Sequence, residues 1–263
     1  MKSLFYCFLL FLPLGILSCS SDDNNSNGSE IKIDVPGEIS GLGNDRGELT
    51  GTKFELPEGI KLNQEIVGYP SRVLGSYASS RASDNNINLD YIEQFIFDYL
   101  LKMMKDGEKY DIAIGSGYAV PIFIVLENTT DKDIKVTFPA GLIVKSQNWE
   151  AQYGLLTKKT EFTAPAKERL RVLLFMHCCH LGIVNPTTAN KLEWGVVSNS
   201  SLLLEICDIV ANKKINYEEF GSLSKQYFKQ AYYIQERIWD LTNRGTALTE
   251  EHKTYLKQLP DSK

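Results

Sequence analysis

Four adjacent side chains in the middle of the chain have the chemistry to bind a metal ion or to form a disulfide. They are His177, Cys178, Cys179 and His180, and they end an apolar run, Leu170 to Cys178, that is typical of a strand. Side chains alternate between the two faces of a strand, so His177 and Cys179 share one face and Cys178 lies on the other. Four adjacent residues therefore do not readily close one tetrahedral zinc site, and no second pair of ligands is spaced for it. We predict no metal site and no cofactor.

The five cysteines fall into two groups. Cys7 and Cys19 lie near the start of the chain, and Cys178, Cys179 and Cys207 lie far from it. Residues that share the strand face of Cys178 are all apolar, which predicts that Cys178 is buried. We therefore predict a disulfide between Cys179 and Cys207, while other pairings of the three thiols stay open.

A glutamine interrupts the apolar face of a helix expected near the end of the chain. The apolar residues of this face recur at helical spacing: Phe228, Ala231, Tyr232, Ile238, Trp239 and Thr242. Gln235 lies in their middle, and burying its amide without partners would cost roughly 1–3 kcal/mol. The simplest expectation is that the amide bonds to a loop carbonyl or to another exposed backbone group.

The segment from Gln235 to Trp239 also resembles a motif of bacterial surface adhesins. It is similar to the Gln-x-x-Ile-Trp segment of their thioester domains, and it follows Cys178 by about 57 residues. The resemblance covers roughly residues 118 to 250. It implies that a strand-terminal cysteine and the glutamine are joined as an internal thioester, with loss of ammonia, and that this bond acylates an amine of a ligand. By this resemblance Gln235 is the acyl donor and Cys178 its partner, with Cys179 as the alternate.

Two positions depart from the pattern of that family. The family favours Thr before the glutamine and Ala two residues after it, whereas this chain has Ile234 and Arg237. A long cation at position 237 makes a tight apolar pocket around the glutamine harder to build.

The first 18 residues have the features of an export signal. Lys2 precedes an apolar run, Leu4 to Leu17, that is too short to span a bilayer. The tetrapeptide Ile16 to Cys19 is similar to the bacterial lipoprotein signal, which implies cleavage before Cys19 and lipidation of its thiol. Residues 20–25 resemble the export signal of Bacteroidota surface lipoproteins. We expect a lipid anchor in the outer membrane with the protein facing the cell exterior; the periplasmic face is the alternative.

Composition predicts a folded domain behind a tether. Of the 263 residues 43% are hydrophobic and 23% are charged, as in ordinary globular proteins. The net charge of -5 and the absence of a dense run of Lys and Arg argue against nucleic acid as a partner. Residues 19–52 are rich in Asn, Asp, Ser and Gly and are predicted to form a flexible tether. A β-rich region over 53–185 and a helical region over 186–263 are expected to pack as one unit.

The hydrophobic patterns predict an α+β fold, an antiparallel β-sandwich or barrel with a packed helix, followed by a C-terminal helical region. The expected helices are 89–104 with Asn88 as cap, 200–211, 227–241, and 250–259 with Thr249 as cap. The expected strands are 120–127, 134–138, 141–145, 161–164 and 170–178. We expect hairpins of neighbouring strands, one after the turn at 128–133 and one across 165–168.

The chain contains none of the common catalytic motifs. It has no Gly-x-Ser-x-Gly elbow, Walker loop, dinucleotide fingerprint or His-Glu-x-x-His helix. Gly115-Ser-Gly117 precedes a strand rather than a helix, so it is predicted to be a turn and not a phosphate loop. We expect a surface-anchored binding or adhesion module, not an enzyme, with a surface protein or a glycan as ligand. The alternatives are a structural or accessory subunit of an envelope assembly, and a glycan-binding or glycan-active lipoprotein whose carboxylates converge only in space.

Overall fold

Strand β10 (Arg169–Cys178) is the longest strand of the structure, a computed structural model that describes residues 34–69 and 89–263. Its residues from Val172 to Cys178 are all buried, which is typical of a strand covered on both faces. One edge of β10 pairs antiparallel with β5 (Val120–Asn128) as far as Met176. The other edge pairs first with the parallel strand β4 (Ile112–Gly115) and then, at His177 and Cys178, with β8 (Gly154–Leu155).

Six of the described strands close into an antiparallel barrel. From β5 the ring continues through β3 (Ile66–Gly68), β11 (Lys191–Ser198), β7 (Leu142–Ser146) and β8 (Gly154–Leu155), and β8 returns to β10. The short strands β1 and β2, residues 51–53 and 60–62, extend the sheet outside the ring. The mixed α+β class is confirmed, and of the two expected arrangements of strands the chain forms the barrel.

The expected hairpins are wrong, although the strands themselves are where the sequence placed them. Strand β6 (Ile134–Phe138) pairs with β9 (Thr160–Ala164) in a separate ribbon, so β6 pairs with neither β5 nor β7, and β9 does not pair with β10. The turn after β5 and the turn before β10 lie side by side, where Lys167 Nζ donates a hydrogen bond to the carbonyl of Thr129. Turn residues determine where a chain bends, but the strand that it then meets depends on the packing of the whole sheet.

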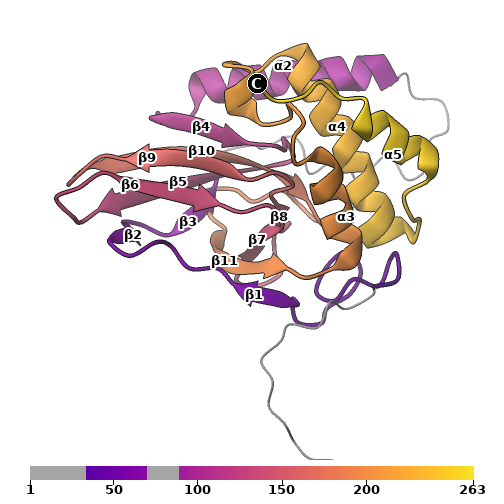
Figure 1. Cartoon of the computed structure of the whole chain (residues 1–263), viewed down its shortest axis with the longest axis horizontal. Coiled ribbons are helices and arrows are strands. Elements are labelled where there is room, and N and C mark those ends of the chain that lie inside the picture. Colours follow the sequence, from indigo (N-terminus) through magenta and orange to yellow (C-terminus); the bar gives the residue numbers. More distant parts are fainter. Residues whose placement is uncertain (1–33, 70–88) are drawn as a thin grey trace, which may run out of the picture.

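Helices cover one end of the barrel and one of its sides (Figure 1). In the described chain they are α2 (Leu89–Asp106), α3 (Ser201–Val210), α4 (Lys225–Trp239) and α5 (Glu250–Lys257). The π-helical segment η3 (Asp240–Arg244) continues α4 without a break. The four spans agree with the helices expected from apolar spacing, within a few residues at each end.

Side chains cap the starts of three helices. Thr249, the predicted cap of α5, accepts a hydrogen bond from the backbone N–H of His252. Ser200 and Ser224 do the same for α3 and α4. The predicted cap Asn88 lies outside the described residues. Within the described ranges, no helix combines the length and the apolar character that crossing a bilayer requires.

Two regional boundaries differ from expectation. The predicted tether, 19–52, is packed onto the domain from residue 34 onward, and Ile39 and Leu42 are each only 1% exposed. Strand β11 lies inside the region expected to be helical; a bulge between Trp194 and Val197 breaks its alternation and hides it in the sequence. Residues 1–33, with the predicted signal and the lipidation site Cys19, lie outside the described residues.

Candidate functional site

Cys178 ends strand β10 at a place where one edge of the strand has lost its neighbour. Strand β5 pairs with β10 only as far as Met176. The N–H of Cys179 donates to the carbonyl of Tyr153 beside β8, so the N–H and C=O of Cys178 point to the opposite edge. Cys178 is fully buried, and a buried peptide group without partners is destabilising.

The side chain of Gln235 completes this edge. Its Oε1 accepts a hydrogen bond from the N–H of Cys178 at 2.7 Å, and its Nε2 donates to the C=O of Cys178 at 2.8 Å. One amide from helix α4 thus makes the pair of bonds that a neighbouring strand would make. Gln235 bonds to the backbone, as expected, but to the buried end of a strand rather than to a loop carbonyl or an exposed group. That backbone belongs to Cys178, the cysteine that the thioester resemblance pairs with Gln235.

The thiol of Cys178 lies among hydrogen-bonding groups and is closed off from solvent. The indole N–H of Trp239 lies 3.4 Å from Sγ and the backbone N–H of His180 lies 3.2 Å from it, while Sγ is 3.1 Å from the carbonyl of His180. Burial raises the pKa of the Cys178 thiol to about 12, against the opposing contact with Trp239. At neutral pH the thiol is therefore protonated, and the carbonyl of His180 is positioned to accept its S–H.

His177 adds no charge to the site. Burial lowers the pKa of His177 to about 3, so its ring is neutral at physiological pH. The side chain of Gln235 and the backbone of Ser116 approach this ring, but neither ring nitrogen makes a hydrogen bond of normal geometry within the described chain. Gly117 lets the loop pack this closely, since a Cβ there would overlap with the backbone of Met176.

The two residues that depart from the adhesin pattern do not place charge beside Cys178. Arg237 forms an ion pair with Asp240, with Nε 2.8 Å from Oδ2, and its guanidinium stacks over the ring of Tyr233. Ile234 packs in an apolar cluster between the helices and the barrel. The cation expected to disturb the pocket is therefore engaged elsewhere.

The predicted disulfide between Cys179 and Cys207 is absent from the structure, in which Cys178, Cys179 and Cys207 are all buried free thiols. Cys179 packs beside Tyr153, whereas Cys207 lies on α3 with its thiol near the backbone of Gly141. Strand parity, which suggested the pair, carries no information on the distance between a strand end and a later helix. The hydrogen bonds of Gln235 join it to Cys178 rather than to Cys179, the alternate partner.

The rings of His177 and His180 lie in different surroundings. His177 faces Gln235, whereas the ring of His180 packs edge-on against Tyr153 and Trp149. Burial lowers the pKa of His180 to about 4. Across residues 34–69 and 89–263, no group of three His, Cys, Asp or Glu side chains converges in a way that could hold a metal ion.

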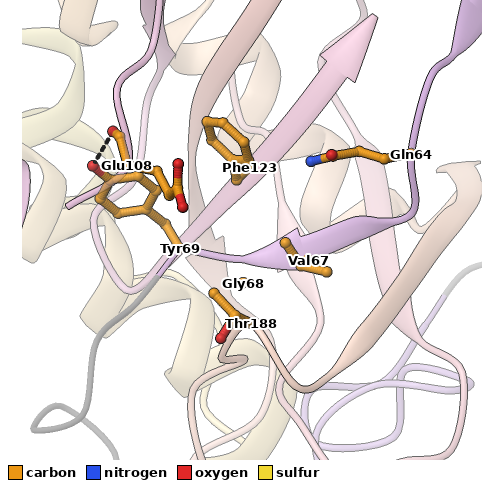
Figure 2. A pocket seen from close by; sticks show the side chains of 7 residues that line it. All are labelled: Gln64, Val67, Gly68, Tyr69, Glu108, Phe123 and Thr188. Carbon is orange, nitrogen blue, oxygen red and sulfur yellow. Dashed lines mark hydrogen bonds between the residues drawn. The ribbon is translucent and has the colours of Figure 1, made fainter.

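A small surface pocket lies away from Cys178, beside strand β3 (Figure 2). Its volume is about 160 Å³, below the several hundred Å³ typical of ligand sites. The hydroxyl of Tyr69 donates to the backbone carbonyl of Glu108 at its rim. The pocket is lined by Gln64, Val67, Gly68, Tyr69, Glu108, Phe123 and Thr188. None of these residues belongs to the Cys178 site, and the pocket contains no nucleophilic thiol.

Comparison with known proteins returns no protein-family model, no curated protein and no solved structure that matches this chain. The functional argument therefore rests on the geometry of the site. Sequence reasoning missed the contact of Trp239 with the thiol, although its position four residues after Gln235 places both on one helix face. It also missed Gly43, whose N–H donates to the carbonyl of Cys179, because nothing in the glycine-rich start of the chain marked that residue.

Proposed function

We propose that this protein is a lipid-anchored binding module of the bacterial cell surface in which Cys178 and Gln235 form an internal thioester. The observation that carries the proposal is the position of the Gln235 amide, hydrogen-bonded to both sides of the Cys178 peptide in a site closed to water. Two groups that lie 57 residues apart in sequence are held together by a strand end and a helix, which is the kind of fixed geometry that favours reaction between them.

The chemistry balances without a cofactor. Sγ of Cys178 attacks Cδ of Gln235, a C–S bond forms, the C–N bond breaks, and the amide nitrogen leaves with the thiol proton as ammonia. An amine of a ligand then attacks the same carbon, which forms an amide and returns the thiol. Neither step needs an oxidant or a reductant.

The surroundings of Cys178 suit an acyl group that must survive until a ligand arrives. Water is kept out, so hydrolysis is slow. His177 is neutral, and Arg237 is paired with Asp240 outside the site. The N–H groups of Trp239 and His180 lie beside the sulfur, where they stabilise negative charge that develops when the thiolate leaves.

The expected lipid anchor places the module at the cell surface, and this location limits the ligands that it can meet. A domain tethered by lipid on Cys19 meets surface proteins and glycans, and lysine amines of a protein are the acceptors that a thioester would use. A glycan ligand has less support, because Trp149, Trp194 and Trp239 are buried or half-buried among other side chains and offer no open aromatic platform.

Intact mass spectrometry tests the thioester directly. The full chain with Cys19→Ser, which keeps the lipid off, is expected to weigh one ammonia less than its sequence, and to gain one methylamine on incubation with that amine. The variants C178A and Q235A are expected to show the full sequence mass, and C207A, a matched control for another buried thiol, to keep the deficit. A full mass for the parent protein would remove the thioester.

The anchor is tested separately by metabolic labelling with an alkyne-bearing fatty acid. Labelled protein is expected in the membrane fraction of cells that produce the natural chain, and none in cells that produce C19S. Equal labelling of both forms would exclude Cys19 as the lipidated residue. The result does not depend on the chemistry of Cys178.

A further inference from the structure

A short segment near the start of the described chain packs against Cys179, the residue that follows Cys178, and against η3. This segment, residues 36–45, is called the strap here. The N–H of Gly37 donates to the carbonyl of Leu241 at 2.6 Å, and the N–H of Gly43 donates to the carbonyl of Cys179 at 3.0 Å. In Figure 1 the strap is part of the indigo chain beside the lower ends of the helices. It therefore joins the end of β10 to η3, the continuation of α4.

Two buried side chains hold the strap in place. Ile39 and Leu42 pack in the apolar cluster formed by Cys179 of the strand end and by residues of α3, α4 and α5. Burial of two large aliphatic side chains favours the docked position. The side chains of Asn44 and Asn243 add a polar contact at the rim.

At Gly43 the backbone of the strap passes tightly between Thr242 and Cys179. The φ of Gly43 is +63°, a conformation that other residues rarely adopt, and a Cβ would overlap with the carbonyl oxygen of Thr242. Only glycine lets the backbone pass between Thr242 and Cys179. These two residues flank the site, because Cys179 follows Cys178 and Thr242 lies three residues after Trp239, whose indole contacts the Cys178 sulfur.

The strap is the covering element that can move at the smallest loss of structure. Cys178 and Gln235 have no exposed surface, so no ligand amine reaches them unless some segment moves. Strand β10 is paired along both edges from Val172 to Phe175, and α4 is a continuous helix. The strap contains no helix or strand, and few backbone hydrogen bonds tie it to the rest of the protein.

We propose that the strap is a lid whose release admits the ligand amine to the Cys178–Gln235 site. Docked, the strap keeps the site dry; undocked, it exposes the strand end and the turn after α4. Its role as a gate for acyl transfer rests on the proposed function, whereas its role as a cover of Cys178 does not. The two are therefore tested by different readouts.

The test compares two glycine substitutions in the full chain carrying C19S. In G43A the new methyl group collides with Thr242, so the strap is expected to undock. In G221A the backbone strain is similar, with φ at +70°, but nothing lies within 4 Å of the new Cβ. L42A is the milder second variant, which loosens the strap without backbone strain.

The readout is the rate of modification of the pair, at Gln235 by methylamine if the thioester is present and at Cys178 by N-ethylmaleimide if the thiol is free, with the modified residue located by fragmentation of peptides. We expect an acceleration of about tenfold or more in G43A, a smaller one in L42A, and the parent rate in G221A. Cys207, a buried free thiol on α3 outside the strap cluster, serves as the internal reference for N-ethylmaleimide and should keep its parent rate with that reagent.

Two results would overturn the lid. One is a rate of modification of the pair in G43A and L42A equal to that of the parent protein. The other is an equal acceleration at the pair and, with N-ethylmaleimide, at Cys207, which indicates unfolding of the whole domain. A parent protein of full mass removes the thioester but leaves the maleimide comparison intact, so failure of the lid and failure of the proposed function are distinguishable.

Discussion

Two of the polar contacts between the helical segments and the strand-rich part of the protein differ in charge and in burial. At the amide junction, Gln235 on α4 bonds to the peptide of Cys178, and both residues are fully buried. At the charged junction, Nζ of Lys158 lies 2.8 Å from each carboxylate oxygen of Glu219, on the 3-10 helix η2 (Tyr217–Glu219). The side chains of this ion pair are 10% and 21% exposed.

The difference shows how the degree of burial selects the chemistry of a contact. A neutral amide can be buried completely once its donor and acceptor are satisfied, whereas a buried charge pair loses more hydration than it regains unless water or several other groups attend it. Lys158 therefore also donates to the carbonyl of Lys213 and to the hydroxyl of Ser262. A site free of water and of net charge is also the one in which an acyl group would persist.

Removing the side-chain amide of Gln235 is expected to cause the largest loss of stability. Q235A leaves the N–H and C=O of Cys178 buried without partners and opens a cavity, so the free energy of unfolding should fall by about 4 kcal/mol. Denaturant unfolding followed by circular dichroism measures it. The control is Q230A on the same helix, where Gln230 is also buried but its Oε1 has no partner; its loss should be less than half as large. Equal losses for the two variants would contradict the strand-like role of Gln235.

Acid should weaken the amide junction before the charged one. The pKa of His177 is lowered from 6.5 to about 3, so the unfolded chain takes up a proton at a higher pH than the folded protein. Stability is therefore lost as pH falls from about 6.5, by roughly 2–3 kcal/mol at pH 4.5. H177N, which has no imidazole to protonate, should show a flatter dependence of unfolding free energy on pH in this window. An unchanged slope would mean that His177 is not held neutral.

Acid should lower the stability contributed by the ion pair of Lys158 and Glu219 by a smaller amount, and only at lower pH. Burial opposes ionisation of Glu219, but bonds led by that of Lys158 hold the pKa of Glu219 below its usual 4.5. The stability it contributes is present above pH 4.5 and is lost as pH falls below that value. K158A should lower the free energy of unfolding by about 2 kcal/mol at pH 7 and should remove this acid-dependent part. The pH dependence of thermal unfolding for the two forms checks both expectations.

An exposed ion pair is expected to contribute least to the free energy of unfolding. Lys191 and Glu65 lie 2.8 Å apart, but their side chains are 58% and 57% exposed. K191A should change the free energy of unfolding by less than about 0.5 kcal/mol, and salt should reduce even that. An effect as large as that of K158A would show that exposure does not rank these contacts.

Local patterns predicted the parts of the Cys178 site but only some of their partners. Alternation along 170–178 placed Cys178 at the buried end of a strand, and helical spacing placed Gln235 on an apolar face. Both were correct because each depends on neighbours in sequence. The pairing of Cys179 with Cys207 was wrong, and so were the hairpins, because each required a distance between segments that no local pattern contains.

Two further errors have the same origin. The sequence pattern does not predict strand β11, because a bulge after Trp194 breaks the alternation of buried and exposed residues. The polar, glycine-rich composition of the strap predicts that it belongs to the tether, yet Ile39 and Leu42 are buried and anchor it to the domain. Composition averages over a segment, whereas two well-placed aliphatic side chains are enough to dock it.

The sequence by itself determined the residue types of the candidate site, the helix and the strand that carry them, and the resemblance that names Cys178 and Gln235 together. Only the tertiary structure decided that the amide of Gln235 replaces a missing strand beside Cys178, and that Gly43 closes the site from the start of the chain. The physical reason is that hydrogen-bond partners 57 residues apart, or farther, are chosen by the packing of the whole barrel against its helices. Periodicity within one segment predicts which face is buried, but it does not predict the segment against which that face packs.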